Sequence, residues 1–193
     1  MTPMTVPTKL TISRLLLATV VMALLFVPGL VARAVALAVF VLASLTDWLD
    51  GYLARRWGQS THLGALLDPI ADKVLVIGVL LALVQLHVVP AWMVLIIILR
   101  EFMITAVRLI AASRGVVLAA EAQGKQKAVS QMVTITLILG ALTIVEASGG
   151  RPAPGVAAAL QLAIDLALWI TIVLTSISGV SFLWRHRGAL APR

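Results

Sequence analysis

Four aspartates that lie close together in an apolar sequence are the residues best suited to chemistry. The chain has eight acidic residues, and Asp47, Asp50, Asp68 and Asp72 fall within 26 positions of one another. A carboxylate at membrane depth is costly and marks a functional site by default. No matching block of lysine or arginine lies between these four, so they need another source of positive charge. Bound divalent cations are the simplest such source.

The spacing of the four aspartates fits a cation site between two helices. Asp47 and Asp50 are three positions apart and Asp68 and Asp72 are four apart, and each spacing puts two side chains on one helix face. Two such helices facing a shared cleft would form an all-oxygen site, which suits Mg²⁺ or Mn²⁺ and not Zn²⁺ or copper. Without cations, four carboxylates would repel one another strongly in a medium of low dielectric constant.

Small residues and an arginine are interleaved with these acids. Gly51, Ala54 and Gly64 would let a bulky ligand approach the backbone. Arg55 lies one turn after Gly51 and can offer a planar fork of donors to phosphate. We call residues 47–72 the aspartate motif.

The aspartate motif resembles the signature of the CDP-alcohol phosphatidyltransferases. That pattern, D-x2-D-G-x2-A-R-x8-G-x3-D-x3-D, is met at all eight fixed positions. The resemblance implies an enzyme that takes a phosphatidyl group from CDP-diacylglycerol and releases CMP, with two divalent cations bound by the four aspartates. It also implies a homodimer, and Asp72 as the general base. The residues that it assigns to the CDP-lipid are Gly51, Ala54, Arg55 and Gly64.

Composition places the chain among membrane proteins. Its 193 residues are 61% hydrophobic and only 12% charged, with a mean hydropathy of +1.08, which excludes an ordinary soluble domain. One domain, residues 1–193, suffices for this length. There is no cysteine, which excludes disulfides, a thiol nucleophile and thiolate metal sites. The net charge of +7 comes from basic residues near segment ends, as expected beside anionic lipid headgroups. Because this distribution fits a membrane surface, we expect no nucleic-acid partner.

Six apolar segments predict an all-α membrane protein with six transmembrane helices, because a spanning helix needs about 20 apolar residues and an isolated sheet could not satisfy its backbone in lipid. The first apolar run ends without a clear cleavage site, so we expect a retained helix and not a signal peptide. The expected helices cover roughly residues 11–28, 33–55, 67–88, 91–113, 127–147 and 156–184.

The distribution of lysine and arginine predicts the orientation in the membrane. With the N-terminus inside, the inner ends and loops hold most basic residues and the outer loops hold only Arg33 and Arg151. We therefore expect a multi-pass protein of the inner (cytoplasmic) membrane, with both termini and the active site on the cytoplasmic side.

The expected fourth helix carries charges within an apolar span. Arg100 and Glu101 lie in its middle, and Glu101, Thr105 and Arg108 fall on one face. Two compatible interpretations are an ion pair between Glu101 and Arg108 that braces the bundle, and a polar wall of the active-site cavity.

Lys125 and Lys127 lie where the expected loop leads into the fifth helix, and they form either a phosphate site at the helix start or ordinary positive-inside lysines. The pattern R-E-x6-R followed by G-K-x-K-x3-Q-M is similar to the phosphatidylglycerophosphate synthases of bacteria, as is the opening P-T-x-L-T-x-x-R. This likeness implies sn-glycerol 3-phosphate as the acceptor. The candidates for binding its phosphate are Arg108, Arg114, Lys125 and Lys127, of which Arg114 rests on charge and position alone. The candidates for supporting roles are Thr11, Arg14, Arg100, Glu101 and Gln131.

Other functions remain open at this point. The same chemistry could use phosphatidylglycerol, as in cardiolipin synthesis, or inositol phosphate as acceptor. A divalent-cation transporter would usually show inverted repeats and a site near the bilayer midplane, and neither is evident here. An inactive scaffold would not need an intact motif. Asp165, alone on the expected sixth helix, suggests a polar contact within the bundle or a dimer seam.

Overall fold

The structure is a computed structural model that describes residues 6–57, 62–113 and 122–187. Within these ranges, side chains are described for residues 13, 15–46, 73–113, 124 and 126–187. The described chain forms six α-helices, which confirms the predicted all-helical fold. They are α1 (Val6–Leu25), α2 (Leu30–Trp57), α3 (His62–Gln85), α4 (Ala91–Ser113), α5 (Ala122–Ala147) and α6 (Pro154–Arg185).

The turns between helices lie where glycine and proline predict them. Gly29 lies directly before α2 with a φ of 111°, and Gly149 and Gly150 follow α5 with φ of 63° and 76°. Because side chains disfavour these angles, glycine is the residue best suited to these turns. Pro154 occupies the first turn of α6, where its missing N–H leaves no intrahelical bond unmade.

Three helices begin five residues earlier than the sequence predicted. The first begins at Val6 and not near 11, the third at His62 and not near 67, and the fifth at Ala122 and not at 127. Lys125 and Lys127 therefore both lie in the first turns of α5, and the placement of Lys125 before the helix was wrong. Each of these first turns contains polar residues or glycine, which lower the local hydropathy without preventing a helix, so hydropathy alone set the predicted boundaries too late.

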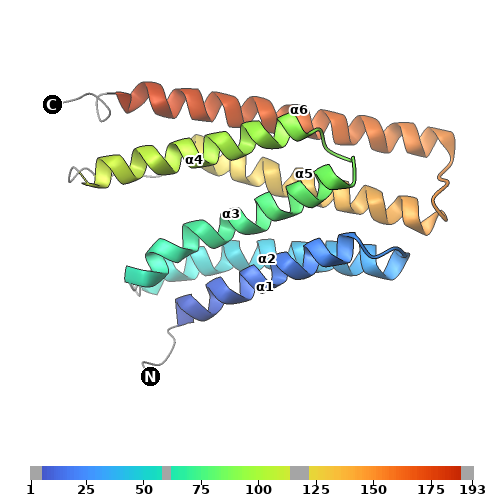
Figure 1. Ribbon diagram of the computed structural model, residues 1–193, viewed down its shortest axis with the longest axis horizontal. Coiled ribbons are helices and arrows are strands. Elements are labelled where there is room, and N and C mark those ends of the chain that lie inside the picture. The colour runs from blue at the N-terminus through green and yellow to red at the C-terminus, as the bar shows by residue number, and fades with distance from the viewer. Residues whose placement is uncertain (1–5, 58–61, 114–121, 188–193) are drawn as a thin grey trace.

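The helices pack as a ring in which each contacts two neighbours. Along the ring α1 contacts α2, α2 contacts α5, α5 contacts α6, α6 contacts α4, α4 contacts α3 and α3 returns to α1. A further contact between α3 and α5 crosses the ring. The start of α1, the end of α2, the start of α3, the end of α4, the start of α5 and the end of α6 gather at one end of the bundle (Figure 1). We call this the motif end, because it brings the two helix segments of the aspartate motif to the same end.

The exterior of the bundle is apolar and part of its interior is polar. Large apolar side chains such as Val31, Phe102 and Val180 are at least 66% exposed. Thr134 and Thr171, in contrast, are buried between α5 and α6, with their hydroxyls 2.8 Å apart. Interhelical bonds of this kind and an apolar outer surface are typical of helices packed within lipid. Among the described residues, Gln126–Ala147 and Pro154–Arg185 are long and apolar enough to cross a membrane by length and composition.

Candidate active site

The aspartate motif divides between two helices. Asp47 and Asp50 lie in the last part of α2, and Asp68 and Asp72 lie in the first part of α3. The helical backbone is described there, so the spacings of three and four residues are helical spacings. The side chains of residues 47–72 lie outside those that the structure describes, which leaves the predicted ligands a prediction.

The length of α2 carries its acids far from the opposite end of the bundle. At 1.5 Å per residue, Asp47 lies about 26 Å and Arg55 about 38 Å along the axis from Leu30. The hydrocarbon core of a bilayer is about 30 Å thick. A helix that enters the core near Leu30 therefore brings its acids to the far boundary and not to the midplane.

A group of polar side chains joins α3, α4, α5 and α6 near the motif end, and we call it the buried polar cluster. Its described members are Lys73, Arg100, Glu101, Thr105, Lys127, Gln131 and Ser178. Its centre is the carboxylate of Glu101, whose Oε1 accepts from Lys127 Nζ and lies 3.0 Å from Arg100 Nη1. Lys127 is 5% exposed and Gln131 is 4% exposed, so the cluster lies in the protein interior and is not a surface ion pair.

Lys73 connects α3 to this cluster. Its ammonium group donates to Thr105 Oγ1, and the Thr105 hydroxyl donates in turn to the Glu101 carbonyl over 2.8 Å. Lys73 directly follows Asp72 in the sequence, so α3 carries the last motif acid and a cluster cation on adjacent residues. Lys73 was not among the predicted site residues, although a lysine inside an apolar span is itself a signal of function.

A small cavity of about 20 Å³ adjoins the cluster. Its polar lining comes from Lys73, Glu101, Lys127 and Gln131. Gln131 Nε2 is buried without a hydrogen-bond partner among the described residues. A cavity of this size, with two to four polar partners, suffices for a single water molecule. The predicted supporting residues Arg100, Glu101 and Gln131 are thus brought together with Lys127.

Arg108 does not pair with Glu101, so the predicted ion pair between these residues was wrong. Its guanidinium lies over the Phe182 ring, 5.5 Å from the centroid, and the residue is exposed. Glu101 is instead paired with Arg100 and Lys127. The spacing of seven residues correctly placed Arg108 on the same helix face as Glu101. Lys127 of α5, however, is the residue that pairs with the Glu101 carboxylate. Helical periodicity within α4 carries no information about a neighbour on another helix.

The remaining predicted residues are not tested by the described side chains. Arg114 lies outside the described residues, and the side chains of Thr11, Arg14 and Lys125 lie outside those described. Asp165 is exposed on α6, and its carboxylate accepts from Gln161 of the same helix over 3.0 Å. Its described hydrogen bond is therefore local and does not join two helices.

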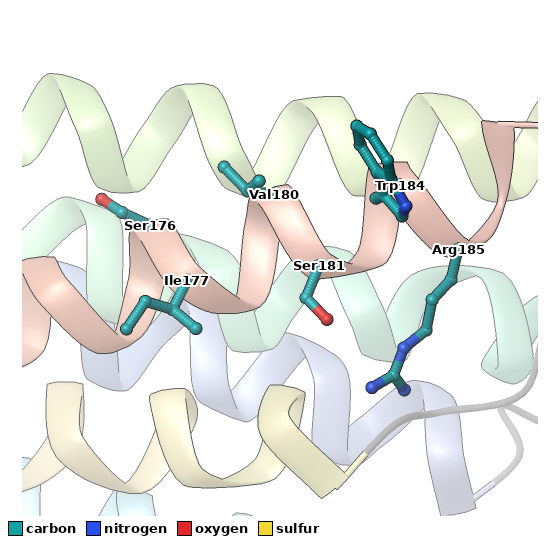
Figure 2. Close-up of a pocket in the computed structure, with 6 residues that line it drawn as sticks. All are labelled: Ser176, Ile177, Val180, Ser181, Trp184 and Arg185. Carbon is teal, nitrogen blue, oxygen red and sulfur yellow. The ribbon is translucent and has the colours of Figure 1, made fainter.

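A shallow groove of about 500 Å³ runs along one side of α6 near the motif end. Figure 2 shows its labelled side chains in a row, from Ser176 at one end to Trp184 and Arg185 at the other. Ile177 and Val180 contribute to its apolar lining. An apolar surface with an arginine and a tryptophan at the helix end is typical of contact with lipid chains and headgroups.

Comparison with known proteins identifies a family for nearly the whole chain. Residues 4–177 match the CDP-alcohol phosphatidyltransferase family. The chain is 35% identical over 196 aligned positions to a CDP-diacylglycerol–glycerol-3-phosphate 3-phosphatidyltransferase of Bacillus subtilis (strain 168), covering 95% of this chain and 96% of that protein. It is 40% identical to the enzyme of the same name from Escherichia coli (strain K12), covering 69% and 76%.

A third relative agrees with these two. The chain is 37% identical to a probable phosphatidylglycerophosphate synthase of Mycobacterium tuberculosis (strain ATCC 25618 / H37Rv), covering 91% of this chain and 78% of that protein. The match to the family spans all six helices except the last residues of α6. The chain therefore belongs to the CDP-alcohol phosphatidyltransferase family and is a membrane enzyme of the transferase class.

Proposed function

We propose that this chain transfers a phosphatidyl group from CDP-diacylglycerol to sn-glycerol 3-phosphate, giving phosphatidylglycerophosphate and CMP. The observation that carries the proposal is the intact aspartate motif at the same end of the bundle as a buried cluster that contains Lys127. The relatives from Bacillus subtilis and Escherichia coli are named for this donor and this acceptor.

The donor set of the aspartate motif fits divalent cations. Asp47, Asp50, Asp68 and Asp72 offer only carboxylate oxygens, and two helices carry them at helical spacings. Oxygen ligands of this kind suit Mg²⁺ or Mn²⁺, and the four residues suffice to hold two ions. When bound, such ions would supply the positive charge that the phosphates of the CDP-lipid require.

The proposed reaction is a displacement at phosphorus. The acceptor hydroxyl oxygen bonds to the phosphorus that carries the diacylglycerol, and the bond from that phosphorus to the bridging oxygen breaks, so that CMP leaves with the electron pair. Asp72 takes the proton of the acceptor hydroxyl. Gly51, Ala54 and Gly64 admit the nucleotide, and Arg55 contacts its phosphates.

Lys127 is the proposed acceptor-phosphate residue with the most structural support. It is buried, it lines the small cavity beside Glu101, and it lies on the helix that starts at the motif end. The described residues of the cluster include three cations, Lys73, Arg100 and Lys127, and one carboxylate, and this excess of positive charge is suited to a second anion. Arg108, Arg114 and Lys125 are proposed on charge and position.

We also propose that the motif end faces the cytoplasm and that the enzyme is a homodimer. The positive-inside bias supports the orientation, and a cytosolic phosphorylated acceptor could then reach the site directly. The chain has no cysteine, so single cysteines report topology without background. Ser148→Cys, on the outer side, should react with an impermeant maleimide on intact cells, and Arg187→Cys should react only after permeabilisation. The reverse pattern would contradict this orientation.

The experiment that tests the function uses purified protein in detergent with CDP-diacylglycerol, Mg²⁺ and sn-glycerol 3-phosphate. CMP and a lipid with the mass of phosphatidylglycerophosphate should appear in equal amounts. A divalent-cation transporter would release no CMP under these conditions, because detergent abolishes transport but not phosphoryl transfer. An absence of CMP from folded protein would therefore contradict the proposal.

A further inference from the structure

We propose that Ser178 and Gly179 of α6 are positioning residues that set the place of the Lys127 ammonium through Arg100 and Glu101. This inference rests on the proposed role of Lys127 in binding the acceptor phosphate. Neither α6 residue touches substrate in this account. Their effect is transmitted through two described side chains of α4.

The contacts form a continuous path from α6 to α5. Arg100 Nη2 donates to Ser178 Oγ over 3.0 Å, and Arg100 Nη1 lies 3.0 Å from Glu101 Oε1. The same Glu101 oxygen accepts from Lys127 Nζ. Because one oxygen serves both cations, a displacement of the Arg100 guanidinium changes the position that Glu101 can offer to Lys127.

Ser178 is a fixed acceptor and not a freely rotating hydroxyl. Its Oγ donates to the Thr175 carbonyl over 3.0 Å, which commits its only proton. The remaining lone pairs are then available to Arg100. Ser178 is 3% exposed, so water does not readily replace this bond, and the planar guanidinium fixes the direction of both of its contacts.

Gly179 provides the space in which the Arg100 side chain lies. A Cβ at position 179 would lie 3.0 Å from Arg100 Cγ and 3.9 Å from its Cβ. The first distance is shorter than ordinary carbon–carbon contact, so a methyl group there has to displace the arginine stem. Gly179 is buried in a regular part of α6, where glycine is less favourable than alanine. The close packing of Arg100 against this position explains why glycine is found there.

The lysine itself needs such a support. Its ammonium group sits on a flexible four-carbon stem, unlike the rigid fork of arginine. A carboxylate held from two sides restricts the positions that this stem can reach, and preorganised groups of this kind bind phosphate with less loss of entropy. The structure therefore connects the sixth helix to the acceptor side of the site.

The experiment compares Gly179→Ala and Ser178→Ala with Gly140→Ala. Gly140 lies within α5 and has nothing within 4 Å of an added Cβ. The Gly140→Ala variant therefore gains the helix propensity of alanine without contacting Arg100. Both α6 variants should raise the KM for glycerol 3-phosphate roughly three- to ten-fold and leave the KM for CDP-diacylglycerol within about two-fold. Gly140→Ala should leave both KM values unchanged. Ser178→Ala removes one oxygen without crowding, so it serves as the milder test if Gly179→Ala folds poorly.

Double variants with Lys127→Met separate this inference from the proposed function. If Lys127→Met raises the KM for glycerol 3-phosphate and Gly179→Ala adds nothing further to it, the two residues act through one path. If Lys127→Met raises that KM but neither α6 variant does, the positioning role is wrong and the proposed function stands. If both substrates' KM values rise in the α6 variants, their role is only structural. An unchanged KM in Lys127→Met would overturn the role of Lys127 itself.

Discussion

Asp72→Asn is expected to lower kcat by about a hundred- to ten-thousand-fold, which is the scale of a lost general base. Asparagine has nearly the same size as aspartate, but its amide cannot accept the proton of the acceptor hydroxyl. Its oxygen can still ligate a cation, so binding of CDP-diacylglycerol should weaken far less than turnover. Initial rates of CMP release, with binding measured by titration of the CDP-lipid, check both parts.

Asp165→Asn is the matched control for this variant. It removes a carboxylate from an exposed position on α6, where the described partner is Gln161 of the same helix. Its kcat should equal that of the unmodified enzyme. A kcat of Asp72→Asn within ten-fold of the control would show that another group takes the proton, and the role of Asp72 would then be limited to binding.

Glu101→Gln is expected to destabilise the fold by about 3 kcal/mol, because it removes the carboxylate from a buried group of cations. Glu101 is paired with both Arg100 and Lys127, whose side chains are 11% and 6% exposed. The glutamine oxygen can still accept hydrogen bonds, but it carries no charge. Desolvated cations beside a neutral group repel one another and lose their compensation. The tryptophan-fluorescence melting midpoint in detergent should fall by roughly 5–10 °C.

The control is Glu146→Gln at the other end of the bundle. Glu146 Oε1 accepts from the Gly29 backbone N–H over 3.1 Å, and a glutamine oxygen can make the same bond. Its melting midpoint should stay within about 2 °C of the parent. Equal midpoints for the two variants would mean that the charge of Glu101 is compensated elsewhere, and the cluster would not be the electrostatic centre described above.

The helix content and the aspartate motif could be predicted from the sequence because both depend on local pattern. Long apolar runs can satisfy their backbone in lipid only as helices, and glycines at 29 and 149–150 mark their ends. The starts of α1, α3 and α5 could not be placed as well, because first turns that contain polar residues or glycine resemble loops in a hydropathy profile.

The buried polar cluster was predictable only in part. Arg100 and Glu101 are conspicuous as charges within an apolar helix, and Gln131 appeared through a family pattern. Their partners depend on how helices pack, so the pairing of Glu101 with Lys127 in place of Arg108 required the tertiary structure. Ser178 carries no signal of its own, since a serine in an apolar helix is common. Its role appears only when α6 lies against α4.

The most direct test of the central claim is acceptor-dependent CMP release by the purified enzyme. CDP-diacylglycerol and Mg²⁺ are supplied with glycerol 3-phosphate, phosphatidylglycerol or inositol 1-phosphate in separate reactions, and the lipid products are identified by mass. Turnover should occur with glycerol 3-phosphate alone and should be lost on adding EDTA and restored by excess Mg²⁺. Turnover only with another acceptor would contradict the acceptor assignment, and turnover that survives EDTA would contradict the cation site of the four aspartates.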